Sequence, residues 1–569
     1  MQLSELEIIR REKLEKFTEL GINPYPAAEY KYTHTSTQIK ENYVEGEKVT
    51  IVGRLMINRI QGSASFAVLQ DAEGRIQLYF HRDTICPNED KFKYNDFYKK
   101  LLDLGDFIGV EGELFKTQTG EITVRVHDFT LLSKALKPLP LPRTDEEGKV
   151  HDAFTDAEQR YRQRYVDLVV NPKVKEIFVK RTKMFTAIRD FFNEAGYFEV
   201  ETPVLQAIPG GAAARPFVTH HNALDIPLYL RIANELYLKR LIVGGFDGVY
   251  EFSKNFRNEG MDRTHNPEFT ALELYVTYKD YYWMMDFTEK LLEFVAIKVN
   301  GTSKAIFGEH EINFKAPYKR ISMADAIKEF TGFDIIGKSE DEIRKAAISM
   351  GIDVNESMGK GKLIDEIFGE KCEGNYIQPT FITDYPIEMS PLTKKHRNNP
   401  ELTERFELMV CGKEIANAYS ELNDPIDQRE RFEAQMKLSE NGDDEAMFID
   451  QDFLRALEYG MPPTAGIGIG IDRLIMFLTN NQSIQEVLFF PQMKPEKLEI
   501  RNEQFEIGDD EKIILDILEK NEGKMLISDL KTQSQLSGKK WDKSSKLLTS
   551  NKLMKIVNEG ENKYFQIVV

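Results

Sequence analysis

The sequence of 569 residues has few of the features that mark disulfide-stapled, zinc-binding or membrane-spanning proteins. Its three cysteines, Cys86, Cys372 and Cys411, are scattered and form no CxxC pair, so neither a disulfide framework nor a zinc site is indicated. No run approaches the ~18 apolar residues of a membrane span, and the charged first residues lack a secretory signal's apolar region. We therefore expect a cytoplasmic protein without membrane contact.

Basic residues are fewer than acidic residues. Asp and Glu number 93 against 75 Lys and Arg, which gives a formal net charge of −18. This balance argues against indiscriminate binding to nucleic acid but leaves room for a local basic surface. Residues 531–555 are one such region, with seven lysines and a single acid, Asp542. A hydrophobic content of 41% and a charged content of 30% are typical of a globular protein, and the length allows about three or four domains.

The N-terminal third divides into a helix and a small barrel. Residues 3–20 carry apolar side chains at roughly helical spacing, and Gly21 and Pro24 supply a stop, which predicts an amphipathic helix. From about residue 48 to 134, short β-rich runs alternate with turns such as DAEG and QTGE, a pattern that predicts a small β-barrel.

One hairpin of this barrel can be placed in register. If Gln70 pairs with Arg75 around the DAEG turn, side chains alternate between two faces. The predicted core face consists of Ala67, Leu69, Ile76 and Leu78. The opposite face consists of Phe66, Val68, Gln77 and Tyr79. On this opposite face an aromatic ring lies beside an amide, so a nucleic-acid base could stack there and be hydrogen-bonded. The alternative, which the pattern supports equally well, is that this face is a second apolar face covered by a loop.

Composition sets the remaining boundaries. We expect an N-terminal helix and lead-in at 1–46, a barrel at 47–135, a proline-rich linker at 136–172, a long α/β region at 173–495 and a C-terminal block at 496–569. Residues 320–370 are strongly helical and lack motif residues, so we interpret them as an insertion. The C-terminal block predicts three helices and a β-like finish, which fits either a winged-helix module or a solvated helical tail.

Two motifs lie in the long α/β region. FRNEGMDRTHNPEFTALELY, residues 256–275, packs many charged groups into a predicted strand, loop and strand, which favours a nucleotide site over a charged surface hairpin. Guanidinium groups bind phosphate, and the Phe269 ring suits stacking on adenine. GIGIGIDRL, residues 466–474, alternates glycine with isoleucine, so one strand face has no side chains and a flat ligand fits against it beside Arg473. Close packing of two backbones is the alternative for such glycines.

Together these motifs resemble the class II aminoacyl-tRNA synthetases, in which FRNE belongs to the second motif and the glycine strand to the third. The first, a helix and strand at the dimer interface, resembles residues 178–203, which end at Pro203. The resemblance implies an α+β fold with an antiparallel sheet. It also implies that Arg257 holds the α-phosphate of ATP and that Arg257 and Arg473 are the catalytic residues. The implied ATP-binding residues are Arg257, Glu259, His265, Asn266, Phe269, Glu414 and Arg473.

The substrate is indicated by GKEIANAYSELNDP, residues 412–425. Aspartate-specific relatives have an arginine seven residues beyond the position of Glu414, where this chain has Glu421, and a pocket that ends in a carboxylate favours an ammonium group. IPGGAAARPFVTHHNALD (208–225) and YLRIANELYLKRL (229–241) also resemble the bacterial-type lysyl-tRNA synthetases. The lysine-binding residues that this implies are Gly211, Glu235, Glu273, Tyr275, Asn417, Tyr419, Glu421 and Gly468.

The same resemblance implies Mg²⁺ held by Glu414 and Glu421. Residues seven apart on a regular strand point to opposite faces, so this pair requires a bulge or a strand end. The barrel resembles the family's anticodon-binding OB-fold, with Arg59, Phe66 and Gln77 as anticodon-binding residues; Ser63 departs from a common lysine. The implied partners are ATP, L-lysine, tRNA(Lys) and a second subunit of a homodimer. The alternatives are an aspartyl or asparaginyl enzyme and a non-catalytic tRNA-binding paralogue.

Overall fold

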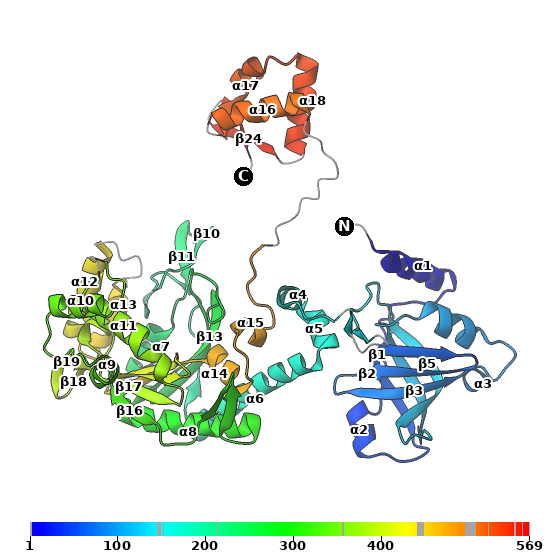
Figure 1. The fold of residues 1–569 in the computed structure, drawn as a ribbon, viewed down its shortest axis with the longest axis horizontal. Helices are drawn as coiled ribbons and strands as arrows, with labels where there is room; N and C mark the ends of the chain where they lie inside the picture. Colours follow the sequence, from blue (N-terminus) through cyan, green and yellow to red (C-terminus); the bar gives the residue numbers. More distant parts are fainter. Residues whose placement is uncertain are drawn as a thin grey trace. The chain divides into compact units, whose positions relative to one another are not determined.

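The computed structural model describes residues 3–144, 150–151, 153–212, 214–355, 358–440, 449–495, 508–521, 523–550, 553–559 and 562–567. The chain forms two compact units, Met1–Gln492 and Met493–Val569, which are described separately (Figure 1).

The N-terminal part of the first unit is a closed five-stranded barrel with the strand order β1-β2-β3-β5-β4. Its elements are α1 (Glu5–Glu19), α2 (Ser36–Glu41), β1 (Lys48–Gln61), β2 (Ala64–Gln70), β3 (Arg75–His81), α3 (Arg82–Ile85), the π-helix η1 (Lys93–Leu101), β4 (Phe107–Lys116) and β5 (Ile122–Ser133).

The predicted hairpin register of the barrel is confirmed. Gln70 pairs with Arg75, and Asp71 stabilises the turn by accepting hydrogen bonds from the backbone N–H groups of Glu73 and Gly74, at 2.8 Å each. The predicted core face is buried: Ala67, Leu69, Ile76 and Leu78 are each at most 2% exposed.

Helix α1 forms as predicted, but its expected apolar stripe is mostly not covered. Phe17 is fully buried, whereas Leu6 is 54% exposed and Ile9 is 38% exposed. Arg10 is buried in their place and donates hydrogen bonds to the carbonyls of Leu104, at 2.8 Å, and of two residues after β5. The helix is therefore held by the Phe17 ring, the Arg10 guanidinium group and an ion pair between Lys13 and Asp103 at 2.6 Å.

The second part of the first unit is built on an eight-stranded sheet with the order β16-β17-β20-β21-β22-β13-β12-β8. The elements up to the second strand of the site are β6 (Arg143–Thr144), β7 (Val150–His151), α4 (Ala157–Arg162), α5 (Arg164–Val170), α6 (Pro172–Glu194), β8 (Phe198–Glu199), β9 (Leu205–Gln206), β10 (Val218–His221), β11 (Ile226–Leu230), α7 (Glu235–Val243), β12 (Gly248–Phe256) and β13 (Glu268–Thr277).

The later elements complete this sheet and its covering helices. They are α8 (Tyr281–Asn300), β14 (Lys304–Phe307), β15 (His310–Asn313), β16 (Lys319–Ser322), α9 (Met323–Thr331), α10 (Glu340–Ser349), α11 (Lys360–Lys371), η2 (Glu373–Asn375), β17 (Thr380–Thr383), η3 (Ile387–Met389), β18 (Lys395–His396), β19 (Asn399–Thr403), β20 (Arg405–Val410), β21 (Lys413–Ser420), α12 (Pro425–Glu440), α13 (Gln451–Glu458), β22 (Thr464–Gly470), α14 (Ile471–Leu478) and α15 (Ile484–Val487).

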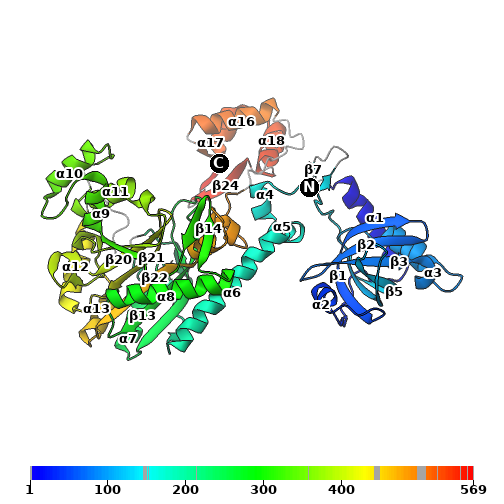
Figure 2. The same ribbon diagram turned by 60° about the horizontal axis from the view of Figure 1, so that its bottom comes forward.

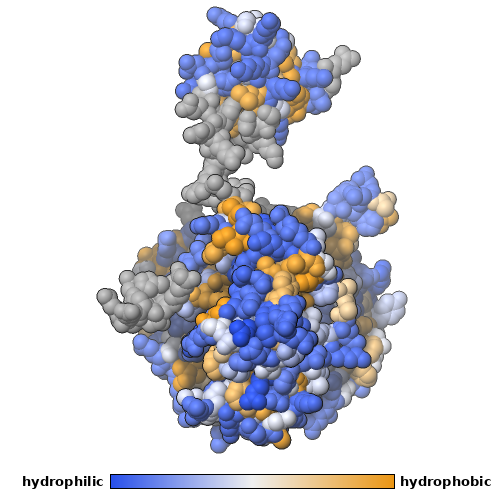
Figure 3. All heavy atoms as spheres, turned by 90° about the vertical axis from the view of Figure 1, so that its right-hand side faces the viewer, coloured by the Kyte–Doolittle hydropathy of each residue, from blue (hydrophilic) through white to orange (hydrophobic). Residues whose placement is uncertain are grey.

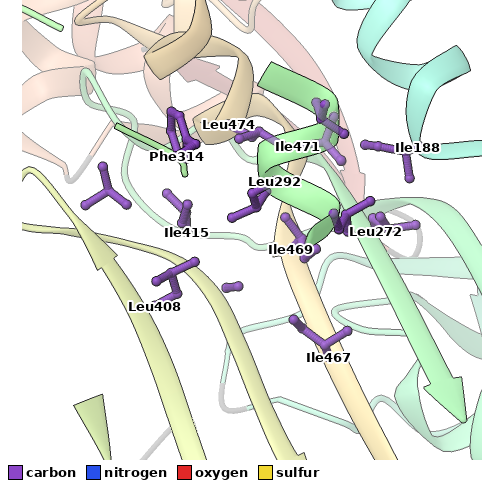
Figure 4. Packing of buried hydrophobic residues seen from close by; sticks show 14 of the residues in the cluster. Ile188, Leu272, Leu292, Phe314, Leu408, Ile415, Ile467, Ile469, Ile471 and Leu474 are labelled. Carbon is purple, nitrogen blue, oxygen red and sulfur yellow. The ribbon is translucent and has the colours of Figure 1, made fainter. Parts of the chain in front are cut away.

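The predicted antiparallel sheet is confirmed for its six central strands. Each edge strand, β8 and β16, pairs parallel to its neighbour. Helices α6 and α8 lie along one face of the sheet (Figure 2). The isoleucines of the glycine-rich strand, Ile467 and Ile469, point into the core on this face together with Leu292 of α8 (Figure 4). The glycines between them therefore belong to the opposite face.

The helical region predicted at 320–370 starts later than expected. Residues 320–322 belong to β16 of the main sheet, and α9, α10 and α11 form the crossover to the parallel strand β17. The helices have a core of their own that includes Ile327, Ile343 and Ile367. The strand was missed because four residues at a sheet edge carry little periodic signal.

The second unit is a small mixed domain with its own core around Trp541, Leu548 and Phe565. Its elements are α16 (Asp509–Lys520), β23 (Lys524–Leu526), α17 (Ile527–Ser534), α18 (Gly538–Ser550), β24 (Met554–Glu559) and β25 (Asn562–Ile567). The strands form an antiparallel sheet in the order β23-β25-β24. This element order is that of the winged-helix alternative, and the buried core does not fit a solvated tail.

Residues 496–507 of the predicted C-terminal block lie outside the described residues. Within the described part of the chain, no helix is long and apolar enough to cross a membrane. Hydrophilic residues cover much of the face shown in Figure 3, with smaller hydrophobic groups between them.

Candidate active site

The glycine-rich strand β22 lies between β21 and β13 and organises the site. Gly468 is opposite Asn417 on one side and Glu273 on the other. Gly466 is likewise opposite Tyr419 and Tyr275. Because directly paired residues point to the same face, these polar side chains gather above a strip of bare backbone.

The space above Gly466 is already filled by side chains. A Cβ at this position would overlap Glu421 Oε1 and come within 2.5 Å of Tyr275 Cε1. At Gly468, by contrast, the nearest side-chain atom would be Glu273 Cγ at 3.9 Å. Gly466 is therefore required because two side chains, not a second backbone, pack against it, whereas Gly468 leaves the open room that the flat-ligand interpretation expects.

Arg257 follows the last residue of β12, as predicted, and its backbone N–H donates to the Pro267 carbonyl at 2.9 Å. Its guanidinium carbon lies 5.1 Å from the centroid of the Phe269 ring. The Nε atom of Arg257 is buried without a hydrogen-bond partner. A buried, unpaired donor beside an open aromatic face suits an anionic ligand.

The structure brings together three more residues of the predicted ATP site. Arg473 Nη2 lies 3.3 Å from His265 Nε2, and Arg473 Nη1 donates to the Glu414 carbonyl at 2.7 Å. The other ring nitrogen of His265, Nδ1, is 2.9 Å from Asp262 Oδ2, so Asp262 orients the imidazole. The loop between β12 and β13 thus meets the start of α14, two segments that are some two hundred residues apart.

Two residues of the predicted ATP set are placed differently. Glu259 is exposed in the loop. The side chain of Asn266 is engaged at both ends: Nδ2 donates to the Glu268 carbonyl at 2.6 Å, and Oδ1 accepts from the Gln492 N–H at 3.2 Å. Asn266 therefore holds the loop in shape, and a direct contact of its amide with nucleotide stays a prediction.

The predicted amino-acid pocket is rich in buried carboxylates. Tyr419 donates from its hydroxyl to Glu235 Oε2 at 2.9 Å, and Tyr275 donates to Glu273 Oε2 at the same distance. Burial, followed by the charge of Glu235, raises the pKa of Glu273 to about 8. A third carboxylate, that of Glu421, completes the pocket.

Glu421 is the most confined of the three. It is 1% exposed, its Oε2 contacts Lys239 Nζ, and its Oε1 has no hydrogen-bond partner. Burial raises the pKa of Glu421 well above its ordinary value; the Lys239 ammonium opposes this rise, and the charges of Glu235 and Glu273 add to it. A buried carboxylate of this kind needs a cation nearby to remain charged.

Two further members of the predicted lysine set lie at the edge of this pocket. Gly211 has a φ of +87°, and a Cβ there would come within 3.4 Å of Glu235 Cβ. Asn417 accepts a hydrogen bond from Arg405 Nε at 3.1 Å. The eight predicted residues therefore lie on α7, on the three strands β13, β21 and β22, directly after β21 in the case of Glu421, and in the loop before β10.

The bulge that the sequence analysis required is present in β21. Leu408 pairs with Ala416 and Met409 with Glu414, so Ile415 is the extra residue. The bulge turns Glu414 to the same face as Asn417 and Tyr419.

The magnesium pair of Glu414 and Glu421 stays a prediction, and the bulge brings Glu414 toward a further carboxylate, that of Glu407 on β20. Burial, followed by the charge of Glu414, raises the pKa of Glu407 to about 7. The charged groups that influence Glu421 are instead Lys239, Glu235 and Glu273. Among the described residues, no group of three or more His, Cys, Asp and Glu side chains is suited to hold a metal. The carboxylate that lies near Glu414 by its electrostatic influence is that of Glu407.

Sequence reasoning missed Glu407 and two basic residues of the site. Arg405 Nη2 is 2.5 Å from Glu407 Oε1 and the same side chain contacts Asn417. Lys239 on α7 lies between Glu235 and Glu421, with Nζ 2.5 Å from Glu235 Oε1 and in contact with Glu421 Oε2. The alternation of RFEL pairs Arg405 with Glu407 on one face, which was an available signal, whereas the position of Lys239 depends on how α7 packs.

A second buried network supports the start of α7. Arg231 Nη1 is 2.7 Å from Glu251 Oε1, and Asn234 Nδ2 donates to Glu251 Oε2 at 2.9 Å. Asn234 directly precedes Glu235, so the network fixes the position of that carboxylate.

The predicted anticodon residues lie close together on the barrel. Arg59 is paired with Phe66, and Gln77 pairs with Val68 two residues along the same strand. The Phe66 and Tyr79 rings contact each other with centroids 5.1 Å apart. Arg59 is exposed and both Phe66 and Gln77 are partly exposed, so this face is accessible to a ligand.

Comparison with known proteins agrees with this geometry. Residues 156–494 match the family described as tRNA synthetases class II (D, K and N), and residues 49–132 match the OB-fold nucleic acid binding domain. A lysine--tRNA ligase of Christiangramia forsetii is 74% identical over 560 residues, which cover 98% of this chain and 97% of the relative.

Two further relatives carry the same name. The lysine--tRNA ligase of Porphyromonas gingivalis is 68% identical over 507 residues, or 88% of each chain. That of Azobacteroides pseudotrichonymphae is 63% identical over 500 residues, which cover 87% of this chain and all of the relative. On this evidence the chain belongs to the class II tRNA synthetases, within the lysine--tRNA ligase family.

Proposed function

We propose that the protein activates L-lysine with ATP, forming lysyl-adenylate and pyrophosphate, and then transfers the lysyl group to tRNA(Lys). The observation that carries this proposal is Glu421, whose buried carboxylate keeps Oε1 without a hydrogen-bond partner over the bare backbone at Gly466. Its position favours an ammonium group as the ligand. In this arrangement Glu421 binds the ε-ammonium of lysine and Glu235 binds the α-amino group, with Glu273 and both tyrosines lining the pocket.

The adenylate forms without a protein nucleophile. The lysine carboxylate attacks the α-phosphate of ATP, and catalysis comes from positioning and from donors that offset the developing charge. Arg257 suits the α-phosphate because its Nε is buried and unpaired. His265 and Arg473, which lie 3.3 Å apart, suit the terminal phosphates that leave as pyrophosphate. Phe269 offers its ring to adenine.

Mg²⁺ fits the pair formed by Glu407 and Glu414. One or two carboxylates together with substrate phosphates are a usual set of ligands for this ion, and a raised pKa beside a second carboxylate indicates a site that favours positive charge. When bound, the ion would neutralise charge on the phosphates. Glu414 is also held against Arg473, with its Oε2 3.7 Å from Nη1, so the ion and the guanidinium group would act on the same phosphates.

The alternative substrates and the non-catalytic alternative fit less well. An aspartate or asparagine substrate would present no side-chain ammonium to Glu421, and an acidic one would be repelled. A paralogue without catalytic activity has no need of an assembled phosphate site, whereas here Arg473 contacts both His265 and Glu414, and Arg257 lies against the Phe269 ring.

For the tRNA, we propose that Phe66 stacks on an anticodon base while Gln77 and Arg59 supply polar contacts. We also propose a cytoplasmic homodimer. Its interface would use the region of β8 to β11, where apolar side chains are exposed, including Phe198 at 58%, Val218 at 64% and Leu205 at 49%. Such a group of exposed apolar residues is typical of a protein interface.

Two substitutions test the roles in the reaction. Glu421→Gln should raise the KM for lysine by about a hundredfold or more in ATP–pyrophosphate exchange and leave the KM for ATP nearly unchanged, because a buried charge pair is worth about 3–5 kcal/mol. Glu289→Gln is the matched control: Glu289 is a buried carboxylate on α8 that accepts from the Tyr318 N–H outside the pocket.

Arg257→Ala should abolish exchange. Normal exchange by either site variant would reject the role assigned to that residue.

A further inference from the structure

The protein places one of its own ammonium groups in the pocket that is proposed to bind the ammonium groups of lysine. Lys239 lies one helical turn after Glu235 on α7, and its side chain is fully buried. Its Nζ is 2.5 Å from Glu235 Oε1 and also contacts Glu421 Oε2. The rings of Tyr419 and Phe453 complete its surroundings, with centroids 5.7 and 6.0 Å from Nζ.

The contacts of Lys239 leave a defined set of carboxylate oxygens for a ligand. Glu235 uses Oε1 for Lys239 and Oε2 for the Tyr419 hydroxyl, so its plane is fixed from two sides. Glu421 uses Oε2 for Lys239, while Oε1 lies at Gly466 without a hydrogen-bond partner. One carboxylate is thereby oriented and the other keeps an oxygen free.

Lys239 also changes the net charge of the pocket. When lysine is bound and the carboxylates of Glu235, Glu273 and Glu421 are all ionised, the one ammonium of Lys239 leaves two negative charges in the pocket. The two ammonium groups of the lysine ligand would balance these two charges, while its carboxylate faces the α-phosphate of ATP. Without Lys239 the pocket would hold three closely spaced carboxylates, and repulsion together with burial would favour their protonated forms.

We propose that Lys239 is a positioning residue for lysine recognition: its ammonium fixes Glu235 and Glu421 in place and offsets their negative charge before substrate arrives. The inference rests on the proposed function, because it assigns Lys239 to the same pocket. The contacts of Lys239 described above are with residues of the lysine pocket and not with the proposed ATP-binding residues. Its substitution should therefore change lysine binding and not nucleotide binding.

An ordinary structural salt bridge would give a different result on substitution. It would stabilise the fold and affect both substrates alike once lost, with no change in how lysine binding depends on pH. A positioning role predicts a selective change in the KM for lysine. It also predicts a shift in pH dependence, because the carboxylates that face Lys239 would take up protons more readily.

The test is ATP–pyrophosphate exchange with the full chain, measured from pH 6 to pH 9. Lys239→Met should raise the KM for lysine about tenfold or more at pH 7 and leave the KM for ATP within about twofold. The pH at which the affinity for lysine begins to rise should be higher in this variant by about one pH unit or more. Lys239→Arg keeps the charge and should retain the unsubstituted protein's pH dependence. Arg240→Met is the matched control, since Arg240 is the next residue on α7 but pairs with Asp450 and Asp452.

Equal changes in the two KM values, or an unshifted pH profile in Lys239→Met, would overturn the role of Lys239. If the unsubstituted chain does not activate lysine, the proposed function itself is wrong. This outcome differs from the previous one, in which the unsubstituted chain activates lysine and only the role of Lys239 is wrong. If Lys239→Met is not folded at pH 8, its thermal unfolding is followed down to pH 5. The proposal expects folding to recover as Glu235 and Glu421 take up protons, and failure to fold at every pH would overturn it.

Discussion

Glu273 is a pocket residue whose protonation changes near neutral pH. Its pKa of about 8 results first from burial and then from the charge of Glu235, with Glu251 acting in the same direction and Tyr275 and Lys239 against it. Below that pH the free pocket holds a proton on Glu273. Lysine binding favours the ionised carboxylate, so the proton must leave when the ligand enters.

We therefore predict that the affinity for lysine rises with pH. The KM for lysine should fall by up to about tenfold per pH unit between pH 6 and pH 8 and level off above pH 8, while the KM for ATP stays flat. Steady-state exchange assays across this range measure both. Glu273→Gln cannot lose a proton and should flatten the dependence; an unchanged slope in that variant would assign the titration to another group.

Single residues also mark the limit of what the sequence can predict. Glu421 was identified because a charge reversal at a motif position changes the preferred ligand by itself. Lys239 was not, because a lysine on a helix is usually solvated and only the packing of α7 against β12, β13 and α13 buries it. Glu407 was missed because its partner Glu414 is aligned with it by the bulge at Ile415, which no local spacing specifies.

At the scale of elements, the two glycines of β22 should respond differently to the same substitution. Gly466→Ala should lower the free energy of unfolding by about 1–3 kcal/mol, because its Cβ would overlap Glu421 and crowd Tyr275. Gly468→Ala has no side-chain atom within 3.9 Å and should unfold with nearly the stability of the unsubstituted protein. Denaturant unfolding compares them, and equal losses would contradict the packing described for this strand.

The barrel hairpin gives a prediction for tRNA. Phe66→Ala should lower kcat/KM for tRNA aminoacylation by about ten- to a hundredfold, since base stacking is worth about 1–3 kcal/mol, and should leave adenylate formation unchanged. Phe107→Ala is the control: it is another exposed aromatic of the barrel, and it is paired with Arg54, five residues from Arg59 along β1. Equal loss of both reactions in Phe66→Ala would point to misfolding instead of lost recognition.

The secondary-structure elements differ in how much of their pairing and packing could be predicted from the sequence. The hairpin of β2 and β3 was predicted in register because a short turn and strict alternation leave one pairing that buries the apolar face. Helix α1 was predicted by its spacing, yet which face packs was not, because Arg10 is held by carbonyls of distant segments. Local patterns thus predicted the elements, and long-range partners decided their contacts.

At the scale of the whole molecule, the second unit should be separable from the chemistry. Residues matched to the class II family end at 494, and a relative of the same name aligns over its full length with 87% of this chain. A chain that ends at residue 495 should retain lysine-dependent pyrophosphate exchange within about threefold, because the unit has a core of its own. Loss of exchange in a folded truncated chain would show that the unit takes part in activation.

The central claim is that this site forms an adenylate from lysine in particular. It is tested most directly by ATP–pyrophosphate exchange with the unsubstituted full chain across a panel of the standard amino acids together with ornithine. We predict strong exchange with lysine, weaker exchange with ornithine because one methylene is worth about 1–3 kcal/mol, and none above background with aspartate or asparagine. Exchange driven by aspartate or asparagine, or none with lysine, would contradict the role of Glu421.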